Sequence, residues 1–284
     1  MKTRIIPILF GIVLLLTASP LLAISKPNPS AHSAILMDAD SGKVLYSKNA
    51  WAIMAPASTT KIMTAIITLE RLNLNTTVSI PATAAAKEGS SMHLAKEEKK
   101  TIRELLYGLM LVSGNDAATA LAIAVSGSEA KFAQLMNQKA SQLGMKNTNF
   151  KNASGLPALN HYTTAYDMAI LSRYAMKNGN FAKIVSTKVK EVSSSKPGAN
   201  RRLVNHNKLL WRYQYTTGVK TGYTRNAGGC LVSTASRNSQ KLIAVVLKSR
   251  YIYDDSQQLF SYGFSKTGSG SKIASAKNDQ PPGT

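Results

Sequence analysis

The sequence predicts an α+β fold, an α/β sandwich in which an antiparallel sheet is assembled from both ends of the chain around a helical insertion. Three observations predict it: short β-rich runs lie near both ends, the middle has the three-and-four apolar spacing typical of helices, and a helical segment follows the last strand. With 44% hydrophobic residues among 284, the composition supports a packed core and excludes an intrinsically disordered chain. No repeat or long linker interrupts it, so we expect one folded domain.

The elements follow in order along the chain. A β-hairpin is expected from runs at 33–37 and 43–47, because the Asp and Gly residues of 38–42 suit a tight turn. The apolar spacing predicts helices at 59–74, 102–111, 116–125, 129–143 (capped by Ser128) and 164–176. Two β-rich runs are expected at 229–236 and 241–247, and a last helix at 253–264.

The first 25 residues have the features of a secretory signal peptide. Lys2 and Arg4 precede the apolar run Ile5–Leu16, and small residues lead up to Ala23. An uncleaved membrane anchor is the alternative, which the prolines and glycine of this stretch disfavour. We expect export to the periplasm or another wall space outside the cytoplasm. Residues 26–265 are then the folded domain, and the Ser, Gly, Lys and Pro-rich residues 266–284 a disordered basic tail.

The chain is strongly basic, with 35 Lys and Arg against 14 Asp and Glu and a net charge of +21. Losing Lys2 and Arg4 with the signal peptide leaves +19, so the charge belongs to the folded body. Such a charge indicates anionic surroundings. Because export argues against nucleic acid, we expect anionic envelope polymers as partners instead.

Neither cysteine nor histidine chemistry is indicated. Cys230 is the only cysteine and lies in the apolar run GGCLVSTA, where a thiol is typically a small buried hydrophobe. The four histidines lack a paired ligand spacing, so we expect them in polar loops or at rims. We expect no metal and no cofactor.

Three short motifs stand out: Ser58-Thr59-Thr60-Lys61, Ser113-Gly114-Asn115 and Lys220-Thr221-Gly222. Each is weak alone, because the same patterns recur, S-x-x-K from Ser128, Ser193 and Ser269 and K-T-G from Lys266. Context separates them. Ser58 opens an apolar helix, which places it one turn from Lys61 on the same face, and Lys220 directly precedes a β-rich run.

These residue types suit acyl transfer. A serine hydroxyl becomes a nucleophile when a base takes its proton, and a lysine can be that base once burial and nearby positive charge lower its pKa. Lys61 is the candidate base, with Lys220 as the nearby charge. Ser113 can pass a proton to a leaving amine, and Asn115 can hold Lys61 or the substrate backbone. A K-T-G strand edge can pair with an extended substrate while its cation attracts a carboxylate.

The motifs in this order resemble those of the serine penicillin-recognising enzymes. Longer stretches are similar to the low-molecular-mass penicillin-binding proteins, the D-alanyl-D-alanine carboxypeptidases: PASTTKIMTA around Ser58, EGSSMHL at 88–94, LVSGNDAATALA at 111–122, LGMKNTNF at 143–150 and GVKTGYTRNAGGCLV at 218–232. The resemblance covers roughly residues 33–264. It implies a β-lactamase-like fold, with a five-stranded antiparallel sheet and helices on both faces.

The resemblance also implies roles. Ser58 would attack the D-Ala-D-Ala carbonyl and carry the acyl group, with Lys61 as proton acceptor and Ser113 assisting. The residues implied in holding the substrate are Asn115, Lys220, Thr221, Gly222 and Arg250, and the oxyanion hole would consist of the backbone N–H groups of Ser58 and Tyr223. Gly89-Ser90-Ser91 matches a loop at the cleft rim. The implied partners are peptidoglycan stem peptides ending in D-Ala-D-Ala and β-lactams as covalent inhibitors.

Departures from the family leave alternatives open. Many members continue into a second, β-rich domain and a membrane-docking helix, for which this sequence is too short, so we expect no attachment by that route. Related D,D-endopeptidases share an A-G-x-C-L-V stretch, although the S-G-N and G-S-S segments favour a carboxypeptidase. No acidic residue between Asn115 and Lys220 matches the deacylating glutamate of class A β-lactamases, so β-lactams should leave Ser58 slowly. A non-catalytic basic protein that binds envelope polymers is the alternative of another class.

Overall fold

The computed structural model describes residues 25–194 and 198–268. Residues 1–24 of the expected signal peptide and residues 269–284 of the expected tail lie outside the described residues. The last helix, α9 (Ile252–Gly268), extends beyond its expected end and includes the first three residues assigned to the tail. No helix in the described ranges is both long and apolar enough to cross a membrane.

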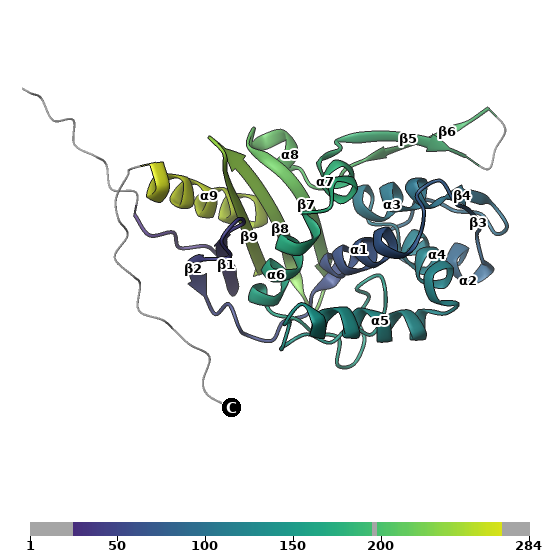
Figure 1. The fold of residues 1–284 in the computed structure, drawn as a ribbon, viewed down its shortest axis with the longest axis horizontal. Coiled ribbons are helices and arrows are strands. Elements are labelled where there is room, and N and C mark those ends of the chain that lie inside the picture. The colour runs from purple at the N-terminus through teal and green to yellow at the C-terminus, as the bar shows by residue number, and fades with distance from the viewer. Residues whose placement is uncertain (1–24, 195–197, 269–284) are drawn as a thin grey trace, which may run out of the picture.

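A five-stranded antiparallel sheet forms the centre of the fold, in the order β2-β1-β9-β8-β7. Its N-terminal part is the expected hairpin of β1 (Ser33–Asp38) and β2 (Val44–Lys48). The other strands come from the far end of the chain: β7 (Thr216–Thr224), β8 (Gly228–Arg237) and β9 (Gln240–Ser249). Because β1 pairs with β9, both chain ends share one sheet (Figure 1). The predicted fold class is therefore confirmed.

Helices cover both faces of this sheet, which explains the almost continuous apolar runs of β8 and β9. Successive side chains of a strand point to opposite faces. Val232 and Val245 belong to the large core shared with the helical insertion. Leu231 and Val246 belong to a smaller core under α9, which contains the aromatic residues of that helix.

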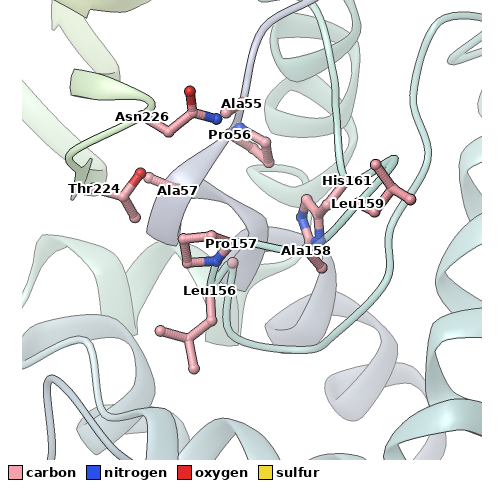
Figure 2. Close-up of a pocket in the computed structure, with 11 residues that line it drawn as sticks. Ala55, Pro56, Ala57, Leu156, Pro157, Ala158, Leu159, His161, Thr224 and Asn226 are labelled. Carbon is pink, nitrogen blue, oxygen red and sulfur yellow. The ribbon is translucent and has the colours of Figure 1, made fainter.

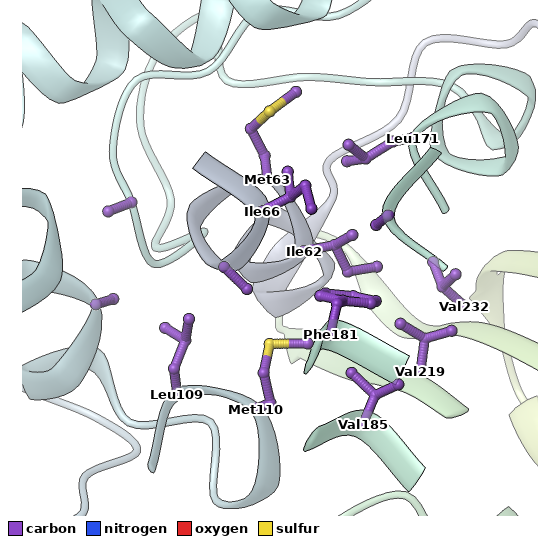
Figure 3. Close-up of a cluster of buried hydrophobic side chains, with 14 of the residues drawn as sticks. Ile62, Met63, Ile66, Leu109, Met110, Leu171, Phe181, Val185, Val219 and Val232 are labelled. Carbon is purple, nitrogen blue, oxygen red and sulfur yellow. The ribbon is translucent and has the colours of Figure 1, made fainter. Parts of the chain in front are cut away.

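The helical layer packs around α1 (Lys61–Arg71), whose residues 61–68 are all buried. Figure 3 shows Ile62 of α1 facing Phe181 and the sheet residues Val219 and Val232. The surrounding helices are α3 (Ile102–Leu111), α4 (Asn115–Ser126), α5 (Glu129–Gln142), α6 (Ala165–Ala175) and α7 (Gly179–Ser186). Ser128 caps α5 as expected, by accepting a hydrogen bond from Lys131 N at 3.2 Å.

Two features differ from the sequence prediction. The helix expected at 59–74 begins as a 3₁₀ turn, η1 (Ala57–Thr60), and α1 starts only at Lys61. Several short elements were not expected, because their strands are mostly exposed and have no clear apolar alternation. They are the antiparallel pair of β3 (Thr77–Ser79) with β4 (Lys99–Thr101), the hairpin of β5 (Val189–Ser193) with β6 (Asn200–Val204), and the helices α2 (Ala82–Ala85), α7 and α8 (Leu209–Arg212).

Candidate active site

The three motifs meet where the helical layer adjoins the edge strand β7. Ser58 lies on the turn η1 and Lys61 begins α1. Ser113 lies between α3 and α4, Asn115 is the first residue of α4, and Lys220 lies on β7. Ser58 is partly exposed, whereas the side chains around it are almost completely buried. The site therefore combines a partly exposed serine with buried polar side chains.

Close backbone contacts fix the turn that carries Ser58. A Cβ atom at Gly222 would lie 2.9 Å from Ser58 N, and one at Gly155 would lie 1.9 Å from Ala57 O. Only glycine permits such an approach at these two positions. Ala57 itself has a φ of 47°, a left-handed conformation that is rare outside glycine. The turn is thus held between β7 and the 152–155 loop, with Ser58 N close to Gly222.

Lys61 has three hydrogen-bond partners, none of them charged. Its Nζ atom lies 3.0 Å from Ser58 Oγ, 2.8 Å from Asn115 Oδ1 and 2.6 Å from the Ser154 carbonyl oxygen. Complete burial, and secondly the positive charge of Lys220, lower the Lys61 pKa far below its usual value, and the charge of Asp116 opposes them. A neutral amine has two N–H donors for the two carbonyl-type acceptors, and its lone pair then faces the Ser58 hydroxyl. This geometry suits a general base.

Lys220 is the second buried lysine of the site. It is 1% exposed, donates to the Thr221 carbonyl oxygen at 2.9 Å, and has a pKa lowered to about 7 by burial. A carboxylate ligand beside it would favour the charged form of this lysine. Lys220 is thus suited to an anionic ligand at the start of the K-T-G motif.

Ser113 occupies a strained backbone conformation. Its φ of 63° places it in the left-handed region, which costs roughly 1–3 kcal/mol for a residue other than glycine. The residue is 5% exposed, and within the described ranges its hydroxyl makes no hydrogen bond. The connection between α3 and α4 therefore holds a hydroxyl that is available to a ligand.

Asn115 and its neighbour Asp116 bind the rim loop. Asn115 Nδ2 donates to the Glu88 carbonyl oxygen at 2.7 Å, and a Cβ atom at Gly89 would lie 2.8 Å from the same nitrogen. The buried Asp116 carboxylate accepts from Ser91 Oγ at 2.6 Å and from two backbone N–H groups of the same loop. The Gly89-Ser90-Ser91 segment therefore contacts the site through Asn115.

Two contributors to the site were missed from the sequence. Asp116 is adjacent to a motif residue, but its role depends on a loop more than twenty positions earlier in the chain. Ser154 contributes a backbone carbonyl, which no residue type identifies. The sequence Asn152-Ala153-Ser154-Gly155 does indicate a tight loop, since Asn152 Oδ1 accepts from Gly155 N at 2.7 Å.

The remaining predicted site residues take no part in the hydrogen bonds around Lys61. Tyr223 follows Gly222 along β7, and its side chain is 73% exposed. Thr221 is half-buried on the same strand. Arg250 is exposed, and its guanidinium lies 5.5 Å from the centre of the Tyr251 ring, with no recorded contact to the lysines of the site in the described structure. The structure thus groups the first two motifs with the K-T-G strand and leaves Arg250 outside the hydrogen-bond network.

The positions of Cys230 and of the four histidines test what the sequence predicts for these residue types. Cys230 is buried, as expected, and burial raises the pKa of its thiol to about 11. Three histidines are exposed. His161 lies in a loop, as expected, but its side chain is buried. In residues 25–194 and 198–268 no group of three His, Cys, Asp or Glu could hold a metal ion.

His161 lines a cavity of about 430 Å³ beside the Ser58 turn. Figure 2 shows its walls, which come from the turn at Ala57, the loop at Leu156 and Pro157, and the end of β7 at Thr224. His161 Nδ1 accepts from Lys151 N at 3.2 Å, so the ring proton lies on Nε2 and is donated to Thr60 Oγ1 at 3.0 Å. Burial and the charge of Lys151 lower the His161 pKa to about 4, so the cavity wall is neutral at pH 7.

Comparison with known proteins identifies relatives over most of the chain. The family model described as D-alanyl-D-alanine carboxypeptidase matches residues 22–250. The D-alanyl-D-alanine carboxypeptidase DacF of Bacillus subtilis is 40% identical over 87% of this chain and 66% of its own length. The D-alanyl-D-alanine carboxypeptidase of Streptomyces sp. K15 is 37% identical over 88% of this chain and 92% of its own.

Solved structures agree with the sequence relatives. The crystal structure of the Streptomyces K15 DD-transpeptidase has a TM-score of 0.81 and 36% identity, and the match covers 85% of this chain and 100% of that one. The D-alanyl-D-alanine carboxypeptidase from Mycobacterium tuberculosis has a TM-score of 0.81 and 32% identity, over 87% of this chain and 95% of the other.

Proposed function

Because the chain belongs to the D-alanyl-D-alanine carboxypeptidase family, we propose that it is a serine-type carboxypeptidase that removes the terminal D-Ala from peptidoglycan stem peptides. One observation carries the proposal: Lys61 Nζ is buried, has only uncharged hydrogen-bond partners and lies 3.0 Å from Ser58 Oγ. That arrangement is a nucleophile paired with a low-pKa base.

The reaction has two steps. Ser58 Oγ attacks the carbonyl carbon between the two D-Ala residues while Lys61 takes the hydroxyl proton, and the N–H groups of Ser58 and Tyr223 stabilise the oxyanion. The C–N bond then breaks as Ser113 Oγ gives its proton to the leaving D-Ala amine and receives the proton that Lys61 had taken, which leaves Lys61 neutral again. Lys61 then takes a proton from water, the hydroxide attacks the ester carbonyl, and the bond to Ser58 Oγ breaks as Lys61 returns that proton to the Ser58 oxygen. Each step returns the protons it takes, so no cofactor is needed.

Substrate binding uses the edge of β7. The terminal carboxylate lies at Lys220 and Thr221, and Arg250 turns from Tyr251 to join them. Gly222 allows the strand to approach the substrate backbone, and Asn115 holds it from the other side. The peptide that precedes the scissile bond continues past Tyr223 toward the cavity at Thr224, where the neutral wall accepts its next side chain. A β-lactam takes the same place and acylates Ser58.

The N-terminal residues and the net charge of +21 support export and retention in the cell wall. The basic body attracts a wall rich in carboxylates and phosphates. Because exposed charges are screened by salt, retention on isolated envelopes should weaken as ionic strength rises.

Replacing Ser58 tests the proposal directly. Ser58→Ala should abolish both labelling by a fluorescent penicillin and release of D-Ala from a soluble pentapeptide. Ser128→Ala is the matched control, because Ser128 opens the same S-x-x-K pattern but only caps α5. It should keep both activities and lose about 1 kcal/mol of folding stability. Unchanged labelling and release in Ser58→Ala would refute the enzyme and favour the non-catalytic polymer-binding protein.

A digest of cross-linked peptidoglycan distinguishes the related reactions. A carboxypeptidase releases D-Ala from pentapeptides and leaves cross-links intact, whereas an endopeptidase releases monomers. Because the Streptomyces structural neighbour is a DD-transpeptidase, the digest should include an added amine acceptor. Transfer to the amine in place of water would identify that reaction.

A further inference from the structure

A second concave surface lies at the beginning of β7, away from Ser58. This cavity of about 620 Å³ is lined by Ser186, Lys188 and residues 210–216, and we call it the aromatic groove. Thr216 and Gly222 are six positions apart on the same strand, a span of about 20 Å at the rise of a β-strand. A ligand in the groove therefore leaves the catalytic site free.

Three aromatic side chains give the groove its character. Trp211 on α8 is 46% exposed, which is unusual for so large an apolar residue. Tyr213 stacks on Phe260 with ring centres 5.9 Å apart, and Tyr215 meets Phe264 edge-on at 6.0 Å. Because α9 holds both tyrosines, the groove has a rigid floor beside one accessible indole.

The charge of the groove is entirely positive. Lys188 and Arg212 line it, and no acidic residue does. Neither cation takes part in an ion pair within the described ranges; Lys188 Nζ lies 5.9 Å from the centre of the Trp211 ring, and Arg212 lies 5.0 Å from that of Tyr253. Weak contacts of this kind leave both cations available to an anion.

Polar groups complete the surface. Gln214 and Ser186 are exposed in the groove. A purely apolar partner would leave such groups unpaired, at a free-energy cost. The surface therefore suits a ligand with flat apolar faces, many hydrogen-bonding groups and negative charge.

We propose that the aromatic groove binds a glycan strand of peptidoglycan. The C–H face of a sugar ring packs on the Trp211 indole, whose ring face carries partial negative charge. Hydroxyl and acetamido groups bond to Gln214, and carboxylates of the strand pair with Lys188 and Arg212. A polyphosphate chain would satisfy the cations but not the indole. The inference rests on the proposed function, because a wall enzyme meets this polymer, and anchoring to it raises the local concentration of stem peptides.

Binding is tested on full-length Ser58→Ala protein, so that turnover does not interfere. Soluble glycan strands freed of stem peptides should quench its tryptophan fluorescence, with Trp51 replaced by Phe to isolate the Trp211 signal. In calorimetry, Trp211→Ala should weaken glycan affinity at least tenfold, whereas Trp211→Phe should retain most of it. Lys188→Ala should weaken binding more than Lys177→Ala, which removes the same charge from an exposed position outside the groove.

Activity measurements distinguish the groove proposal from the proposed carboxypeptidase function. With Ser58 intact, Trp211→Ala should raise KM on intact peptidoglycan and leave penicillin labelling and D-Ala release from a soluble pentapeptide unchanged. Equal glycan affinity of wild type and Trp211→Ala, or binding of polyphosphate without binding of glycan, overturns the groove proposal. Absence of D-Ala release by the wild type overturns the proposed function and leaves the glycan titration to stand by itself.

Discussion

Lys61 and Lys100 are both completely buried lysines, but their surroundings differ. Lys61 Nζ has a hydroxyl, an amide and a carbonyl as partners. Lys100 Nζ lies 3.2 Å from a carboxylate oxygen of Glu98 and 3.6 Å from one of Glu104, and it donates to Ser193 Oγ at 2.7 Å. Burial beside neutral groups and another lysine produces a candidate base, whereas burial between two carboxylates produces an ion-pair network.

The Lys100 network connects the β5–β6 hairpin to the segment around β4 and the start of α3. Glu98 receives two hydrogen bonds from Arg201 of the β5–β6 hairpin, at 2.6 and 2.9 Å. Burial acts to raise the pKa of Glu104. This effect is outweighed by hydrogen bonds from Ser193 and Thr101 and by the positive charge of Lys100, so the pKa is lowered to about 2. These contacts join the hairpin, β4 and the beginning of α3. We infer that the Lys100 network stabilises the fold. At Lys61, burial without a charged partner costs folding free energy, but it lowers the pKa of the amine and so suits Lys61 to act as a base.

The largest of the expected effects is a loss of acylation rate in Lys61→Met. Without the base, acylation of Ser58 by a fluorescent penicillin should slow on the order of 10³-fold. Methionine fills similar space and needs no hydrogen bonds, so the variant should remain folded with stability equal to or above that of the wild type. Stopped-flow labelling and urea unfolding measure the two quantities. Acylation at the wild-type rate would remove Lys61 from the mechanism.

Lys100→Met should have the opposite profile. Removing the cation leaves two carboxylates without their shared partner, and unfolding free energy should fall by about 3 kcal/mol. The acylation rate per folded molecule should change less than threefold. Lys99→Met is the matched control, since its exposed side chain loses the same charge with little effect. A stable Lys100→Met protein would contradict the structural role.

The pH dependence of folding stability should also distinguish the catalytic site from the Lys100 network, with smaller effects than the two substitutions above. The lowered pKa of Lys220, about 7, means that the unfolded chain binds more protons from there up to the ordinary lysine range. Its contribution to stability therefore rises with pH across that window, and Lys220→Met should flatten this part of the profile.

Glu104 should act at the other end of the pH scale. With its folded pKa lowered to about 2, its contribution is present above its usual pKa and is lost as pH falls toward 2. Glu104→Gln should flatten only the acid limb. Denaturant unfolding from pH 2 to 10 measures both variants, and a change in the same limb for both would contradict the distinction between the regions.

The sequence by itself determined the family, the fold class and most long elements, because these depend on local signals. Apolar periodicity in α3 and α5, the Ser128 cap and the turn between β1 and β2 are all encoded within a few residues. The spacing of Ser58 and Lys61 likewise placed them one helical turn apart. The three motifs were recognisable because each is a short contiguous segment, although their roles remain proposals.

Only the tertiary structure decided what surrounds each lysine. Short motifs mark Lys61 and Lys220 in the sequence, but nothing local shows that Lys100 is buried or which groups each of the three lysines contacts. The Ser154 carbonyl, the Asp116 contacts to the rim loop and the Glu98 to Arg201 pairing all join positions more than twenty residues apart. Hydrogen bonding and desolvation depend on distance in space, and packing sets that distance. The aromatic groove has the same origin, since α8, β7 and α9 become neighbours only in the fold.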